Sequence, residues 1–146
     1  MKKKLVVALG NPLVPADAAA VEAVRTLPHL WAVDNDMEIL EGGTDLLRLA
    51  EALRDRELIV LIDTAMGARE PITVLEHGSP ALLDRQQHAH HLSAVQSLEL
   101  IRWSDENVRN ARCVWILLRT DADAGAQLAD AIGQPADHFL HDRKVQ

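Results

Sequence analysis

Three uninterrupted apolar runs constrain the fold of this chain more than any other feature of its sequence. They occupy residues 5–9 (LVVAL), 58–62 (LIVLI) and 113–118 (CVWILL). Such runs, rich in Val, Ile and Leu, are typical of β-strands that are buried on both faces. Strands of this kind belong to mostly parallel sheets that helices cover on both sides. The runs therefore predict an α/β fold.

The segments between these runs predict the remaining elements. Apolar residues at helical spacing indicate helices over residues 18–27, 45–53 and 92–103, and a short helix over residues 124–132. Shorter strands are expected at residues 37–41 and 72–75, and residues 31–33 form either a strand or a loop. This alternation predicts a three-layer αβα architecture: a mostly parallel, twisted sheet of about five strands with helices on both faces. The strand at 72–75 follows its predecessor without a helix, so we expect an antiparallel edge there.

Length, charge and cysteine content narrow the class of protein. The 146 residues fit one domain, which we expect to span residues 1–146. The formal net charge of −7 argues against a general nucleic-acid binder and against binding to an anionic membrane surface. The single cysteine, Cys113, excludes an intramolecular disulfide, and its apolar neighbours indicate a small buried side chain rather than a nucleophile. No apolar run reaches transmembrane length, so a cytoplasmic protein is expected.

Two acidic residues and a histidine are placed where the crevice of an open α/β sheet forms. Asp17 stands at the start of the first helix, Asp63 follows the run 58–62, and His90 precedes the helix 92–103. Loops at the carboxyl ends of the strands line that crevice, and two carboxylates with one imidazole suit a divalent metal. Each residue also has an ordinary interpretation. Asp17 suits a helix-capping acid, Asp63 a turn residue that reaches solvent, and His90 a surface or satisfied core histidine.

Two further features leave alternatives open. Gly42 and Gly43 suit a strand-to-helix turn that needs positive φ or a close backbone approach, and equally a surface over which a ligand passes. His77 lies near a turn, and we interpret it as incidental. The usual signatures of dinucleotide-binding, P-loop, serine-hydrolase and zincin sites are all absent from the sequence.

Taken together, these patches resemble the [NiFe]-hydrogenase maturation endopeptidases. Members of that family open with a strand, a Gly-Asn-x-Leu turn and an acidic pair before a helix, which here reads LGNPLVPAD over residues 9–17. Next come a strand ending in acid-Gly-Gly-Thr/Ser, here EGGT over residues 41–44, and a strand ending in Asp63. A histidine at a helix start, here His90, completes the pattern, and the resemblance covers residues 5–118.

The resemblance implies a function and a set of site residues. The family removes a C-terminal extension from the large-subunit precursor of a [NiFe]-hydrogenase once nickel is in place, and the nickel belongs to the substrate. By position, Asp17, Asp63 and His90 are the implied catalytic and metal-binding residues, with cadmium or zinc as possible surrogates for nickel. Gly42, Gly43 and Thr44 are the implied substrate-binding residues. The sequence offers no paired Ser, Cys or Thr nucleophile, which favours metal-linked hydrolysis. Separately, the acidic composition gives no hint of a large apolar interface, so we expect a monomer when the protein is free.

The chain departs from the family pattern in its first loop. Ala16 replaces the first acid of the usual pair, and the alanines at positions 18–20 replace glycines that members often carry. Two alternatives therefore stand beside the endopeptidase. One is a catalytically silent member that binds the precursor as a chaperone. The other is a small doubly wound domain that binds a different ligand at the same crevice.

Overall fold

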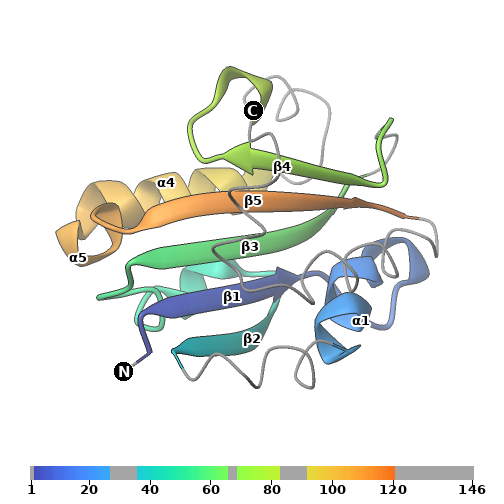
Figure 1. The fold of residues 1–146 in the computed structure, drawn as a ribbon, viewed down its shortest axis with the longest axis horizontal. Helices are drawn as coiled ribbons and strands as arrows, with labels where there is room; N and C mark the ends of the chain where they lie inside the picture. Colours follow the sequence, from blue (N-terminus) through green and yellow to red (C-terminus); the bar gives the residue numbers. More distant parts are fainter. Residues whose placement is uncertain (1, 27–35, 66–68, 83–91, 121–146) are drawn as a thin grey trace.

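The computed structural model describes residues 2–26, 36–65, 69–82 and 92–120, and they form an α/β fold around one sheet (Figure 1). The sheet has five strands in the order β2-β1-β3-β5-β4. Their bounds are β1 (Lys4–Leu9), β2 (Met37–Gly43), β3 (Leu58–Ala65), β4 (Ile72–Glu76) and β5 (Arg112–Arg119). The described helices are α1 (Ala19–Thr26), α4 (Leu92–Ser104) and the short α5 (Glu106–Arg109).

The sheet is parallel except at one edge. The pairs β1·β2, β1·β3 and β3·β5 are parallel, whereas β4 pairs with β5 in the antiparallel sense. Figure 1 shows β4 running against its neighbours at the top of the sheet. The predicted antiparallel edge is therefore confirmed, and so is the mostly parallel sheet.

Two apolar cores lie on opposite faces of the sheet, because alternate residues of each strand point to opposite sides. On one face, Val6, Val60 and Ile116 pack with Val21 and Val24 of α1. On the other face, the intervening strand residues pack with α4, α5 and the segment after β2; these include Leu5, Val7, Ile59, Leu61, Trp115, Leu98, Ile101, Val108 and Leu53. This arrangement confirms the three-layer prediction and explains why the three central strands read as unbroken apolar runs.

The predicted helix over residues 45–53 is wrong. The segment contains only the 3₁₀ helix η2 (Leu46–Leu49), followed by turns. Asp45 caps η2 by accepting a hydrogen bond from Leu47 N–H, and Ala50 N–H donates to Leu47 C=O with the i→i+3 spacing of a 3₁₀ turn. Leu46 and Leu53 are buried, but Leu47 is 47 % exposed, so the apolar residues do not form the continuous helical face that the pattern predicts.

Strand β3 is longer than its apolar run. It continues through Asp63 and Thr64 to Ala65, because β5 extends beside it and pairs as far as Ala65↔Arg119. The expectation that Asp63 stands beyond the strand, where it reaches solvent, is therefore wrong. Asp63 lies within β3 and is only 4 % exposed.

Three of the predicted features fall outside the described residues: the segment 31–33, His90 and the helix 124–132. The structure adds two short elements that the sequence pattern does not reveal, η1 (Pro15–Asp17) and α5. Among the described helices, none has the length and apolar character needed to cross a membrane.

Candidate active site at the β1/β3 switch point

The direction in which successive strands are added to the sheet reverses between β1 and β3. From β1 it passes through α1 to β2 on one side, and from β2 it crosses to β3 on the other side of β1. The carboxyl ends of β1 and β3 therefore flank a reversal of the strand order in the sheet. Such a topological switch point is the usual ligand site of an open α/β sheet.

Asp17 is held above the end of β1 by the loop that precedes α1. Its Oδ2 accepts a hydrogen bond from Asn11 N–H at 2.8 Å, and its own N–H donates to Val14 C=O at 2.8 Å. The side chain is half-buried. The carboxylate therefore binds the loop rather than the free N–H groups of α1, which was the ordinary interpretation of this residue.

Asp63 reaches the same corner of the sheet from β3. The ladder between β1 and β3 ends at Ala8↔Ile62, so Asp63 stands one position beyond the last pair, level with the end of β1. Its Oδ1 accepts a hydrogen bond from Thr64 N–H at 2.8 Å. Two of the three predicted site residues thus lie beside the switch point, Asp17 in the loop that follows β1 and Asp63 near the end of β3.

Thr64 carries a polar atom that the protein itself does not satisfy. The residue is 2 % exposed, and its Oγ1 is buried without a hydrogen-bond partner among the described residues. Buried hydroxyls are normally hydrogen-bonded, so an unpaired one beside Asp63 is notable. It lies in the same strand segment as the predicted site.

The two glycines at the end of β2 have different roles. Gly42 lies at an irregularity in the β1·β2 register, and an added Cβ there would lie 2.7 Å from Val7 Cγ1 and 2.8 Å from Leu49 Cδ1. Internal packing alone therefore explains Gly42. Gly43 has φ +64°, is exposed, and would meet no atom within 4 Å if it carried a Cβ. With the exposed Thr44, it leaves an open surface next to the loop that holds Asp17, because Gly10 N–H donates to Gly43 C=O at 2.9 Å.

The third predicted ligand, His90, lies outside the described residues. Within residues 2–26, 36–65, 69–82 and 92–120, no group of three or more His, Cys, Asp or Glu side chains is placed to hold a metal ion. The assignment of His90 to this site stays a prediction.

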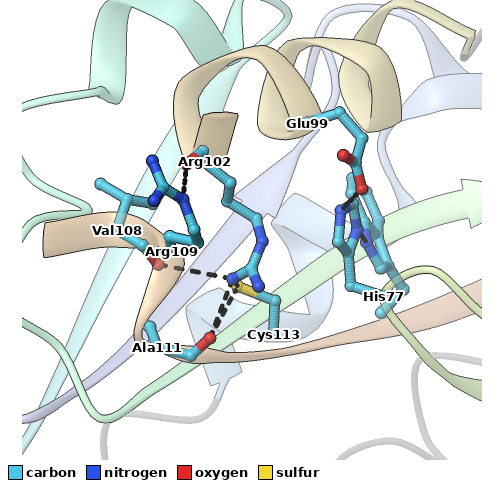
Figure 2. A network of polar contacts seen from close by, with 8 residues as sticks. His77, Glu99, Arg102, Val108, Arg109, Ala111 and Cys113 are labelled. Carbon is cyan, nitrogen blue, oxygen red and sulfur yellow. Dashed lines mark hydrogen bonds and ion pairs between the residues drawn. The ribbon is translucent and has the colours of Figure 1, made fainter. Parts of the chain in front are cut away.

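A second polar cluster lies at the opposite end of the sheet and joins α4 to β5 (Figure 2). Trp115 Nε1–H donates to His77 Nδ1 at 3.0 Å, and His77 Nε2 lies 2.5 Å from Glu99 Oε1. Arg102 donates to Ala111 C=O at 2.8 Å and contacts Cys113 Sγ at 3.1 Å. His77 is therefore a buried part of this cluster, with a side chain that is 6 % exposed, and it does not lie among the candidate site residues.

Burial shifts the pKa of two titratable groups in this cluster, His77 and Cys113. It lowers the pKa of His77, against the opposing effect of the Glu99 carboxylate, so the imidazole is held in its neutral form. Burial raises the pKa of the Cys113 thiol, although the Arg102 guanidinium works the other way. Cys113 is thus a protonated thiol near the amino end of β5, and its burial is as the sequence predicts.

Comparisons with known proteins point to one group. No protein-family model matches the chain. The Hydrogenase 2 maturation protease of Escherichia coli is 25 % identical to it over 117 residues, which cover 77 % of this chain and 71 % of that protein. The hydrogenase expression/formation protein HupD of Thiocapsa roseopersicina is 26 % identical over 97 residues, covering 64 % of this chain and 44 % of HupD. The chain is a relative of the hydrogenase maturation proteases.

Solved structures of maturation proteases share its fold. The [NiFe] hydrogenase maturation protease HybD from Thermococcus kodakarensis superposes with a TM-score of 0.70 at 24 % identity, over 95 % of this chain and 99 % of that one. The hydrogenase maturating endopeptidase HybD from E. coli gives a TM-score of 0.69 at 17 % identity, over 97 % and 94 %. The α/β fold predicted from the sequence is thus the fold of known maturation proteases.

Proposed function

We propose that this protein is an endopeptidase that removes the C-terminal extension of a [NiFe]-hydrogenase large-subunit precursor after nickel insertion. In this proposal the substrate's nickel is recognised by Asp17, Asp63 and His90. The names of its sequence relatives support the choice of reaction. The observation that carries the proposal for this chain is the delivery of Asp17 and Asp63 to one switch point.

The donor set fits a divalent cation of the substrate. Asp17 keeps Oδ1 free of hydrogen bonds from the rest of the described chain, and Asp63 lies near the end of β3, level with the end of β1. Two carboxylates and the His90 imidazole would leave coordination positions open, as recognition of a metal already held by the precursor requires. When bound, such a metal either polarises the scissile carbonyl or activates a water molecule.

Exposed residues lie beside this corner of the sheet. Gly43 and Thr44 are exposed at the end of the edge strand β2, and Gly43 is joined to Gly10 by a backbone hydrogen bond. We propose that Gly43 and Thr44 contact the extension near its cleavage point. Gly42 is left out of this role because its neighbours explain it fully.

The site is tested by the rate at which purified variants cleave nickel-loaded precursor. Asp17→Asn, Asp63→Asn and His90→Ala should each lower that rate by at least about 100-fold while keeping the fold, because each removes a donor that acts on the reacting group. Glu106→Gln is the matched control: it removes an exposed carboxylate from α5, near the amino end of β5. Wild-type rates for all three site variants would contradict the proposal. Stable association of the wild-type protein with the precursor, without cleavage, would favour the silent binder.

A further inference from the structure

The loop that carries Asp17 is closed by hydrogen bonds within itself. Asn11 N–H donates to Asp17 Oδ2 at 2.8 Å, and Asn11 Oδ1 accepts from Leu13 N–H at 2.9 Å. Val14 N–H donates to Asn11 C=O at 3.1 Å, and Asp17 N–H donates to Val14 C=O at 2.8 Å. A carboxylate that accepts a backbone N–H is fixed in orientation, because the donor itself cannot rotate away.

Gly10 determines how closely Asp17 approaches β1. It is buried and has φ +132°, a conformation that residues with a side chain rarely adopt. A Cβ built on Gly10 would lie 2.2 Å from Asp17 O and 3.3 Å from Asp17 Oδ1. Since the first contact is with backbone, the whole of Asp17 would have to move away. The position is also tied to β2 through Gly10 N–H and Gly43 C=O.

These contacts give the two oxygens of the Asp17 carboxylate different environments. Oδ2 is engaged by Asn11 N–H, whereas Oδ1 accepts no hydrogen bond from the part of the chain that the structure describes. We infer that Gly10 and the backbone N–H of Asn11 are positioning groups for Asp17: they clamp it through Oδ2 and present Oδ1 as the atom that takes the substrate's nickel. This inference rests on the proposed function for the identity of the ligand, and on the loop geometry for the clamp.

A double-mutant cycle distinguishes an effect of Gly10 on the position of Asp17 from a general loss of protein stability. Isothermal titration with Ni²⁺ alone is applied to wild type, Gly10→Ala, Asp17→Asn and the double variant, with thermal unfolding recorded for each. We expect Gly10→Ala to weaken nickel binding about tenfold, as loss of a group that orients a metal ligand does. In the Asp17→Asn background the same change should have no further effect, because Gly10 acts through Asp17.

Gly78→Ala is the matched control. Gly78 also has positive φ, at +85°, but an added Cβ there meets nothing within 4 Å, and it lies in the turn after β4. Gly78→Ala should therefore introduce backbone strain, as Gly10→Ala does, but the variant should keep wild-type nickel affinity. If Gly10→Ala does not fold, Asn11→Ala replaces it. That change keeps the N–H but removes the acceptor of Leu13 N–H, so it should weaken nickel binding in the same direction.

An amide signal tests the clamp without nickel. In wild type, the Asn11 amide proton should resonate downfield and exchange slowly, because it donates to a carboxylate. It should move upfield in Asp17→Asn and in Gly10→Ala, and stay in place in Gly78→Ala. Retention of this signal and of full nickel affinity in Gly10→Ala would overturn the inference, and so would additive losses in the double variant. An intact signal in a wild-type protein that binds no nickel would instead count against the proposed function and leave the clamp standing.

Discussion

Two adjacent residues of β3, Asp63 and Thr64, differ in how their buried polar groups are satisfied. Both are almost completely buried, yet both are polar. Burying a polar group costs free energy unless it is hydrogen-bonded, paired or bound to a ligand. Asp63 has its hydrogen bond from Thr64 N–H, whereas the Thr64 hydroxyl has no partner in the described chain. The hydroxyl is therefore a group whose removal is informative.

Thr64→Val should leave the protein as stable as wild type or stabilise it by up to about 1 kcal/mol, because an unpaired hydroxyl is replaced by a methyl group of the same shape. Urea unfolding measures this. Thr73→Val is the control, since Thr73 Oγ1 in β4 is also buried without a partner among the described residues. A loss of more than 1 kcal/mol in Thr64→Val, but not in Thr73→Val, would show that the Thr64 hydroxyl is satisfied in solution.

The lowered pKa of His77 predicts how the free energy of unfolding depends on pH. Because burial lowers its pKa in the folded state, the unfolded chain binds a proton near pH 6.5 while the folded protein does not. The free energy of unfolding should therefore fall as the pH drops below 6.5, by at most about 1.4 kcal/mol per pH unit from this residue. The loss ends once the pH passes below the folded pKa.

The measurement compares wild type with His77→Gln by urea unfolding between pH 8 and pH 5. Gln does not titrate, so the difference in stability between the two proteins should shrink as the pH falls below 6.5. A difference that stays constant or grows across this range would mean that His77 is protonated in the folded protein.

Among the elements, the segment after β2 departs most from its sequence pattern. Its leucines have helical spacing, but the chain forms the 3₁₀ helix η2 and then turns. Asp45 could cap a longer α-helix in the same way, so the cap does not explain why the segment forms only a 3₁₀ helix. The distinction comes from packing: Leu46 and Leu53 enter the core beneath α4 and β1, and Leu47 is left in solvent.

This packing predicts unequal effects of two leucine truncations. Leu53→Ala should lower the free energy of unfolding by about 2 to 5 kcal/mol, because Leu53 is completely buried and its removal leaves a cavity. Leu47→Ala, at a residue that is nearly half exposed, should change it by less than about 0.5 kcal/mol. Chemical denaturation gives both values. Equal losses would indicate that residues 45–53 form the amphipathic helix after all.

For the whole molecule, the sequence predicts the fold better than the site. The runs 5–9, 58–62 and 113–118 identify the three central strands because burial on both faces leaves a direct signature in the sequence. The lack of a helical sequence pattern between the two strands likewise indicates the antiparallel pairing of β4. The burial of Asp63 could not be predicted from the local sequence pattern, because it depends on how far strand β5, distant in the sequence, extends beside β3.

For the candidate site, the sequence suggests a location but not the contacts within it. The strand-end rule places Asp17 and Asp63 at one edge, yet the bond from Asn11 N–H to Asp17 depends on the path of a loop that has no periodic pattern. His77 gave no local signal either, because Trp115 and Glu99 are far from it in the sequence. Contacts of this kind are set by tertiary structure rather than by neighbouring residues.

If this protein cuts a hydrogenase precursor as proposed, the intact mass of that precursor reveals the cleavage. The nickel-loaded large-subunit precursor is incubated with and without the protein, and a nickel-free precursor is treated in parallel. We expect the mass to fall by that of one C-terminal peptide only when both the protein and nickel are present. An unchanged mass, in a precursor that an active maturation protease still cuts, would contradict it.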